Sequence, residues 1–298
     1  MALNITPVKN HREREKGLII YPVYSRRSKG LSIGINLFPD KKKCQFDCPY
    51  CEVFPFSNPE NRAIFSLKQM ETELRAAIIY AQEQKIPIKD LCFSGNGEPT
   101  LSPYFPKALI LAEKIRQETF DVSETLVVSE TLAVSDASVK IVVITNGAGF
   151  LDPQIFSLLK NAASAKKGFN SPIDIWLKLD AGTPEWYQKM NRTSLSFEKL
   201  YKNIKKFTDN APVTIQTMIC SINGEIPSET ETAIWELSVC KLAEKGNVRK
   251  VQLYGKARPA PEDPLAEALD AEYLENRAAS LRKKFINEKI TIPVEVYL

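Results

Sequence analysis

The chain has 298 residues, of which 44% are hydrophobic and 26% are charged, and this balance excludes a disordered or low-complexity protein. Its formal net charge of +4 is unevenly placed, because ten Lys and Arg against three acids give the first 43 residues +7 and leave −3 for the rest. The N-terminus lacks the apolar core of a secretory signal and no run reaches the length of a membrane helix, so we expect a cytoplasmic protein without a membrane partner.

The sequence predicts three parts along the chain. We expect a basic N-terminal arm over residues 1–30, a folded core over 31–260 and a C-terminal extension over 261–298. The charge of the arm could attract phosphate, nucleic acid or an acidic substrate, and a solvated tail is the alternative. Arg26 and Arg27, together with Arg192, are candidates for binding an anionic substrate, with surface ion pairing as the alternative.

Apolar alternation and helical spacing predict a regular order of strands and helices. Strands are expected over residues 31–37, 90–94, 140–145, 173–179, 213–219 and 248–254, and helices over 67–81, 106–117, from 153, up to 207, and over 229–245 and 265–284. Strands that alternate with helices at this spacing pair in parallel through right-handed crossovers. Six such units predict an open (β/α)6 barrel of the TIM type, with a doubly wound sheet as the alternative. Residues 290–297 predict a further strand of undetermined place.

A six-residue tandem repeat interrupts this order. Residues 123–128 read SETLVV and are followed at once by SETLAV at 129–134. Insertions between a helix and a strand are tolerated at the surface of a protein, so we expect a surface loop over 121–138 that has no role in chemistry. A flap that binds a partner is the alternative.

One loop holds half of the six cysteines. Cys44, Cys48 and Cys51 are spaced so that three thiolates would hold one metal centre. A structural zinc site takes four ligands, and the only histidine, His11, lies far upstream. A cluster of four irons and four sulfurs is ordinarily held by four cysteines, so three cysteines would leave one iron open for chemistry.

Polar residues interrupt the apolar strands at their C-terminal ends, where α/β barrels gather their reacting groups. They are Gly95, Gly97 and Glu98 after the second predicted strand, Asn146 after the third, Lys178 and Asp180 at the fourth, Gln216 in the fifth, and Gln252 and Tyr254 in the sixth. The two glycines allow close backbone approach, and Glu98 presents an acceptor. Lys178 and Asp180 share one face of a strand, so a structural contact between them is the alternative to a functional role.

Together these motifs resemble the radical S-adenosylmethionine (SAM) superfamily. The cysteine loop, with the aromatic Tyr50 before its third cysteine, resembles the cluster loop of that superfamily. Residues 94–100, SGNGEPT, resemble its GGEP motif with Asn96 in place of the second glycine. Residues 22–39, 145–147 (TNG), 178–182 (KLDAG) and 190–192 (MNR) extend the likeness, over about residues 20 to 260, to the group that contains the wyosine synthases.

The resemblance implies a cofactor set and a site. Cys44, Cys48 and Cys51 would ligate one [4Fe-4S] cluster, whose open iron binds SAM. Gly95, Gly97 and Glu98 would bind the methionyl amino group, and further SAM contacts are expected at Tyr50, Asn146, Lys178, Asp180, Gln252 and Tyr254. The archaeal wyosine synthases carry a second cluster on N-terminal cysteines, and this chain has no cysteine before Cys44.

The resemblance also implies a reaction. The reduced cluster would cleave SAM to methionine and a 5′-deoxyadenosyl radical that abstracts hydrogen from the substrate. The electron would come from a small donor such as flavodoxin or ferredoxin, and a base in transfer RNA is the leading substrate candidate. An activating enzyme that places a radical on a partner protein is the second candidate. An iron-sulfur electron carrier and a zinc-binding module are the non-enzyme alternatives.

Overall fold

The computed structural model describes residues 5–9, 17–53, 64–121 and 139–298 of the chain. The chain divides into two compact units. The first contains residues 1–43, 55–144 and 165–173, and the second contains residues 44–54, 145–164 and 174–298. The tandem repeat at 123–134 and residues 10–16 of the basic arm lie outside the described residues.

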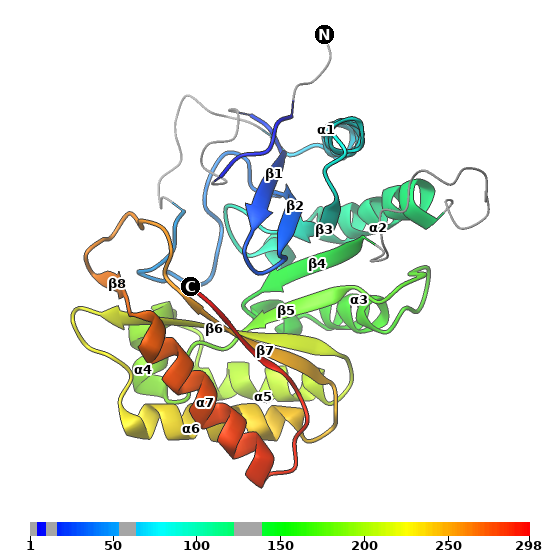
Figure 1. Ribbon diagram of the computed structural model, residues 1–298. Helices are drawn as coiled ribbons and strands as arrows, with labels where there is room; N and C mark the ends of the chain where they lie inside the picture. Colours follow the sequence, from blue (N-terminus) through cyan, green and yellow to red (C-terminus); the bar gives the residue numbers. More distant parts are fainter. Residues whose placement is uncertain (1–4, 10–16, 54–63, 122–138) are drawn as a thin grey trace. The chain divides into compact units, whose positions relative to one another are not determined.

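The first unit is a four-stranded arrangement with two long helices (Figure 1). Its elements are β1 (Ile20–Ser25), β2 (Gly30–Ile35), α1 (Leu67–Glu83), β3 (Ile88–Phe93), the 3-10 turn η2 (Pro99–Leu101), α2 (Phe105–Arg116), a π-helical turn η3 (Gln117–Asp121) and β4 (Lys140–Thr145). β1 is antiparallel to β2, whereas β2, β3 and β4 are parallel neighbours. Helix α1 packs against β1 and against α2.

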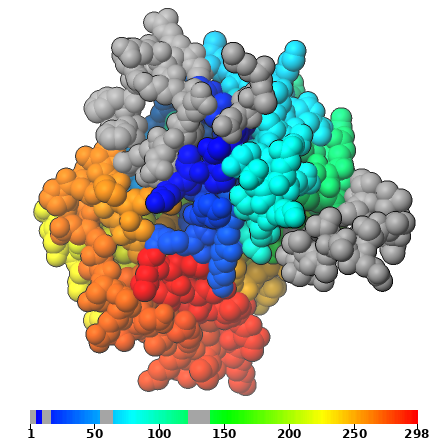
Figure 2. All heavy atoms as spheres, turned by 45° about the horizontal axis from the view of Figure 1, so that its top comes forward, coloured from blue at the N-terminus to red at the C-terminus, as the bar shows by residue number. Residues whose placement is uncertain are grey.

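The second unit repeats the alternation of strand and helix. Its elements are η5 (Ala148–Leu151), α3 (Pro153–Ala163), β5 (Asp174–Lys178), α4 (Pro184–Asn191), α5 (Phe197–Thr208), β6 (Val213–Ile222), α6 (Glu229–Ala243), β7 (Val248–Gly255), β8 (Ala266–Ala268), α7 (Ala271–Asn287) and β9 (Val294–Tyr297). β5, β6, β7 and β9 are parallel neighbours, and β8 pairs with β6 antiparallel. Figure 2 shows α7, in orange to red, beside the red C-terminal segment that it contacts.

The sequence determines these elements through burial and capping. All ten residues of β6 are buried, as expected for a parallel strand covered on both faces. Thr183, Ser196, Ser228 and Asp270 precede α4, α5, α6 and α7, and each side chain accepts a backbone N–H of the first turn. Most polar residues of the predicted site lie at or near the C-terminal ends of the parallel strands.

The predicted fold class, a partial (β/α)6 barrel, is confirmed. The strands β2, β3 and β4 of the first unit and β5, β6 and β7 of the second are each followed by a helix, and neighbouring strands within each unit are parallel. Three details of the prediction were wrong or incomplete. The strand predicted as the first is β2, since β1 precedes it. Residues 266–268 form β8, although a helix was predicted from residue 265. The C-terminal segment lies parallel to β7 as β9. In the described part of the chain, none of the helices has the length and hydropathy needed to cross a membrane.

Candidate functional site

The three cysteines lie on one turn of the second unit. Cys48 is buried, and Cys44 and Cys51 are half-buried. The Cys51 N–H donates to the Cys48 carbonyl at 3.0 Å, which closes the turn. The Phe46 N–H lies 3.4 Å from the Cys44 sulfur. None of the three forms a disulfide, so the loop presents three sulfur donors.

Two side-chain amides reach the sulfurs of this loop. Asn146 follows β4, and its Nδ2 lies 3.6 Å from the Cys44 sulfur while its Oδ1 accepts the Ala148 N–H at 2.9 Å. Asn191 ends α4, and its Nδ2 lies 3.4 Å from the Cys48 sulfur. N–H donors beside thiolates are one of the means by which a protein sets the properties of an iron-sulfur centre.

Asp180 is the centre of a buried polar network beside the cysteine loop. Its Oδ2 accepts the Tyr50 hydroxyl at 2.5 Å and lies 3.1 Å from the Lys178 ammonium. Its Oδ1 accepts the Met218 N–H at 2.9 Å. Asn191 Nδ2 is a further donor, 3.3 Å from Oδ2. The contact between Lys178 and Asp180 that the sequence left open is therefore present.

Lys178 connects this network to β7. Its ammonium donates to the Tyr254 hydroxyl at 2.7 Å and lies 4.9 Å from the centroid of the Tyr50 ring. Burial lowers the pKa of Lys178, but the negative charge of Asp180 and the hydrogen bond with Tyr254, among other contributions, together outweigh burial and leave this pKa above its usual value. The lysine therefore stays charged at neutral pH and keeps a positive charge at a half-buried position of the second unit.

The Cys48 thiol is subject to opposing effects. Burial raises its pKa, while the positive charge of Lys178 and the hydrogen bond from Asn191 oppose the rise. The pKa of Tyr50 lies well above its usual value because the ring is buried and because Asp180 is close. Tyr50 is therefore a neutral donor to Asp180.

Gln216 and Gln252, two further candidates, bind each other. Both are fully buried, and Gln216 Nε2 donates to Gln252 Oε1 at 2.6 Å. Gln252 Nε2 lies 3.5 Å from the Tyr297 hydroxyl of β9. Tyr254 thus joins the network of Lys178, whereas the two glutamines link β6, β7 and β9.

The glycine loop SGNGEPT lies in the first unit. Gly97 has a φ of +149°, and a Cβ at this position would lie 1.9 Å from the Lys43 carbonyl oxygen. The backbone of Lys43, the residue before Cys44, bonds this loop on both sides: its N–H donates to the Asn96 carbonyl and its carbonyl accepts the Glu98 N–H, each at 2.9 Å. Glycine is required at position 97 because the two backbones are in contact.

Asn96, which replaces a glycine of the GGEP pattern, fixes the same loop. Its Nδ2 donates to the Phe38 carbonyl at 3.0 Å, and its N–H donates to Asn36 Oδ1 at 3.0 Å. Glu98 is buried, and its Oε1 accepts the Thr100 hydroxyl at 2.6 Å and the Thr100 N–H at 3.3 Å. The predicted acceptor therefore also caps the short turn η2.

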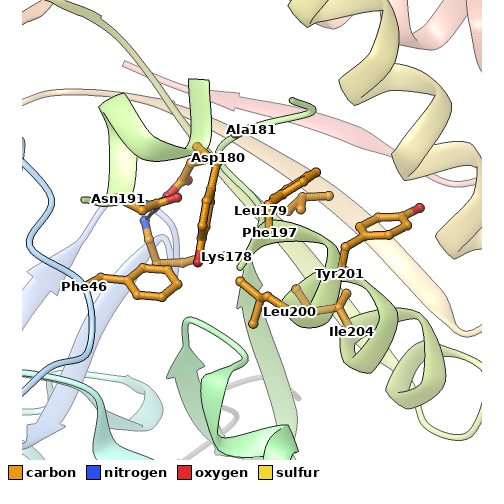
Figure 3. A pocket seen from close by; sticks show the side chains of 11 residues that line it. Phe46, Lys178, Leu179, Asp180, Ala181, Asn191, Phe197, Leu200, Tyr201 and Ile204 are labelled. Atoms are coloured by element: carbon orange, nitrogen blue, oxygen red, sulfur yellow. Dashed lines mark hydrogen bonds and ion pairs between the residues drawn. The ribbon is translucent and has the colours of Figure 1, made fainter. Parts of the chain in front are cut away.

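A small cavity lies next to the Asp180 network (Figure 3). It is lined by Phe46, Lys178, Leu179, Asp180, Ala181, Tyr187, Asn191, Phe197, Leu200, Tyr201 and Ile204. Its volume of about 10 Å³ is enough for roughly one water molecule. The Tyr187 hydroxyl is buried and has no hydrogen-bond partner in the described part of the chain.

The three arginine candidates lie in two separate parts of the chain. Arg26 and Arg27 are in the turn that joins β1 to β2, where the Arg26 carbonyl accepts the Lys29 N–H at 3.2 Å. Arg192 follows α4, and its guanidinium pairs with Glu262 at 2.7 Å and lies 3.9 Å from Asp47. The ion-pair alternative is thus present for Arg192.

The donor chemistry of the cysteine loop fits an iron-sulfur cluster. It consists of three thiols. Cys44 and Cys48 each lie beside an amide N–H donor, and Cys48 also lies near the charge of Lys178. Within the described ranges, no group of three or more His, Cys, Asp and Glu side chains is arranged to hold a metal ion. The fit therefore rests on the donors and their surroundings.

A family model decides the class of this site. The model is described as the radical SAM superfamily and matches residues 41–234, which include the cysteine loop, the glycine loop and Asp180. The chain belongs to the radical SAM superfamily. Radical SAM membership implies SAM-dependent chemistry at a [4Fe-4S] cluster and a need for a reductant.

Two curated relatives, each named UPF0026 protein, come from two strains of Helicobacter pylori. One is 25% identical over 277 residues, which covers 91% of this chain and 78% of the relative. The other is 28% identical over 187 residues, which covers 62% of this chain and 53% of the relative. The chain thus matches about half of the length of the second relative.

Radical SAM proteins of known structure share the fold. A radical SAM methyltransferase from Sphaerobacter thermophilus is 14% identical with a TM-score of 0.57, and the match covers 90% of this chain and 66% of that one. TYW1 with a lysine-pyruvate adduct bound is 15% identical with a TM-score of 0.51 and coverage of 85% and 73%. A mutant of spore photoproduct lyase is 11% identical with a TM-score of 0.53 and coverage of 88% and 76%. At these identities the likeness shows the fold.

Sequence reasoning missed two side chains that line the cavity beside Asp180. Asn191 was noted only within the run of residues 190–192, and Tyr187 was not singled out. Both lie on α4, a short helix that follows the strand end instead of belonging to it. The structure buries both, whereas Gln188 and Lys189 between them are exposed, and this burial depends on how α4 packs.

Proposed function

We propose that this protein is a radical SAM enzyme that holds one [4Fe-4S] cluster on Cys44, Cys48 and Cys51 and cleaves SAM. The observation that supports the proposal is a loop of three cysteines, outside any disulfide, beside amide donors and a half-buried lysine, within a chain of this superfamily. When bound, the reduced cluster supplies one electron to the sulfonium of SAM, which yields methionine and a 5′-deoxyadenosyl radical. The electron comes from a small donor such as flavodoxin or ferredoxin.

We assign different roles to Lys178 and Asp180: Lys178 binds SAM, and Asp180 orients its neighbours. Four donors surround the Asp180 carboxylate, which matches the roughly four lone-pair positions of an ionised carboxyl group. Asp180 is therefore assigned to orienting Tyr50 and Lys178 and not to direct contact with SAM. The Lys178 ammonium has three N–H groups, and after Asp180 and Tyr254 one remains for the carboxylate of the cofactor.

Other residues complete the proposed SAM site. Glu98, with the close-packed backbone of Gly95 and Gly97, binds the methionyl ammonium, because a carboxylate accepts charge-assisted hydrogen bonds. Asn146 and Tyr50 support the cluster ligands, and Tyr254 positions Lys178. Gln252 is assigned to the link between strands by its bond to Gln216.

The test of the proposal is spectroscopic. Protein reconstituted without oxygen should contain about four irons and four sulfides per chain. The electron paramagnetic resonance signal of the reduced cluster should change when SAM is added, because the fourth iron has no protein ligand. Cys48→Ala should take up no stable cluster. One tightly bound zinc without sulfide, or a reduced signal that SAM leaves unchanged, would reject the proposal.

A base in transfer RNA is the substrate that we propose. The concentration of positive charge in the first 43 residues supports it, because neutralisation of phosphates drives nonspecific binding of nucleic acids. The resemblance of the motifs to the wyosine-synthase group supports it as well. The absence of cysteines before Cys44 argues against a second cluster of the archaeal wyosine-synthase kind within this sequence.

A further inference from the structure

Asn191 joins the end of α4 to the cysteine loop in two ways. Its carbonyl accepts the Asp47 N–H at 2.9 Å, and its side-chain nitrogen lies 3.4 Å from the Cys48 sulfur. The residue is 2% exposed, so both contacts are shielded from water. Arg192 then adopts a left-handed backbone with a φ of +41° and ends the helix at this point.

The surroundings determine which side-chain atom of Asn191 faces the network. Nδ2 lies 3.3 Å from Asp180 Oδ2 and 3.3 Å from the Tyr50 hydroxyl oxygen (Figure 3 shows Asn191 beside Asp180). A carboxylate only accepts hydrogen bonds, so the atom that faces it must be the donor nitrogen and not Oδ1. The Tyr50 hydroxyl gives its own proton to Asp180, so its oxygen is an acceptor for Asn191.

The amide of Asn191 therefore has two N–H groups and three acceptors. All three separations, 3.3 to 3.4 Å, exceed the usual N–H···O length of about 2.9 to 3.0 Å, although sulfur is a larger acceptor. The two N–H groups are therefore shared among the three acceptors. An acceptor that becomes more negative will take a larger share of them.

We propose that Asn191 is a positioning residue that donates an N–H to the sulfur of Cys48 when this cysteine ligates the cluster. The proposal rests on the proposed function, since it needs a cluster on this loop. The bond holds Cys48 in a fixed orientation against the Tyr50 and Asp180 pair. It also stabilises the additional negative charge of the reduced cluster, and so raises the reduction potential.

Two variants and one matched control test the proposal. Asn191→Leu removes the donor at similar size, and Asn191→Asp keeps the shape but replaces the donor with an acceptor. Gln188→Leu makes the same chemical change at an exposed position of α4. The readout is an anaerobic redox titration of the reconstituted cluster without SAM, together with iron content and the midpoint of urea unfolding.

We expect the control to titrate like the parent. In Asn191→Leu the equilibrium for cluster reduction should shift about tenfold toward the oxidised form, which corresponds to about 59 mV for one electron. Asn191→Asp should shift it at least as far in the same direction. A purely structural residue would leave the potential of a fully loaded cluster unchanged.

Each remaining outcome supports or overturns the proposed role of Asn191. A variant that holds parental iron and titrates like the parent overturns the proposal. Loss of iron at a parental urea midpoint supports the positioning role, whereas loss of iron with a lowered midpoint in both variants overturns it in favour of a role in folding only. A parent that takes up no iron and sulfide overturns the proposed function itself, and the iron content of the parent shows this separately.

Discussion

The Glu98 carboxylate has two tasks that one substitution can separate. It accepts the hydroxyl and the N–H of Thr100 through a single oxygen, Oε1, and so caps the turn η2. In the proposed site its charge also binds the methionyl ammonium. Glutamine preserves an oxygen acceptor for Thr100 and removes the charge, whereas alanine removes both.

Glu98→Gln should therefore bind SAM about tenfold more weakly than the parent at parental stability. The reason is that a hydrogen bond to a charged group exceeds a neutral one by about 1.4 kcal/mol, which is a factor of ten in affinity. Glu98→Ala should show the same loss of affinity and also unfold about 0.5 to 2 kcal/mol more easily, because the cap is lost. Equilibrium binding to cluster-loaded protein and urea unfolding measure both effects. A glutamine variant with parental affinity would leave Glu98 as a cap only.

At the residue scale, the sequence predicted which side chains form the site better than it predicted the contacts between them. The cysteine spacing predicts a metal centre locally, and the strand-end position of Lys178 and Asp180 predicts that they lie together. The bonds of Tyr50 to Asp180 and of Lys178 to Tyr254 span 130 and 76 residues, so no local pattern contains them. The placement of Asn191 depends on how α4 packs, which is a tertiary property.

At the scale of elements, α6 anchors the turn between β5 and α4. Glu231 in the first turn of α6 accepts the Gly182 N–H at 2.5 Å with Oε1 and the Thr183 N–H at 2.8 Å with Oε2. Gly182 is packed against the backbone of Trp235, so a Cβ would lie 2.3 Å from its nitrogen. The turn that follows Asp180 is thereby fixed by one carboxylate.

Glu231→Gln should lower the free energy of unfolding by about 1 to 3 kcal/mol at neutral pH, because its amide group would face a backbone N–H as a donor. Burial raises the pKa of Glu231, while the two N–H donors oppose the rise. The folded protein thus holds this proton more tightly than the unfolded chain. The pH-dependent part of the stability that Glu231 contributes is largest below its unfolded pKa of about 4.3 and declines as pH rises through the folded pKa, whereas the two N–H contacts of the carboxylate account for the loss in Glu231→Gln.

Urea unfolding at several pH values above about 4.3 measures this dependence, which Glu231→Gln should lack. Glu229→Gln is the control, because Glu229 is an exposed acid of the same helical turn, and its stability should stay within about 0.5 kcal/mol of the parent. A glutamine variant at position 231 with parental stability and parental pH dependence would show that the anchor is dispensable.

The sequence predicted the elements well where strand and helix alternate. The bounds of β4 match the expected residues 140–145, and β3, β5, β6 and β7 lie within a few residues of prediction. β1 escaped prediction because Pro22 and the basic residues around it made the segment look like an arm, yet it pairs with β2 as an antiparallel strand. β8 has only three residues, too few for a period to show.

At the scale of the whole molecule, the uneven charge bears on the substrate. If the basic segment binds transfer RNA, affinity should fall with salt, by about 0.7 to 0.9 log units per log unit of salt for each phosphate neutralised. Arg26→Ala combined with Arg27→Ala should flatten this slope and leave SAM cleavage unchanged. Binding of bulk transfer RNA at several salt concentrations measures the slope, and mass spectrometry of nucleosides from cells without the protein identifies a modified base. Salt-insensitive binding with an unchanged nucleoside profile would remove transfer RNA and favour a partner protein as the substrate.

The central claim is that the loop of Cys44, Cys48 and Cys51 supports reductive cleavage of SAM. The direct measurement is to reconstitute the cluster without oxygen, reduce it, add SAM and quantify 5′-deoxyadenosine and methionine by chromatography and mass spectrometry. The account predicts that both products form with the parent and that neither forms with Cys48→Ala. A parent that carries four irons and four sulfides per chain, is fully reduced and yet forms no 5′-deoxyadenosine would contradict it.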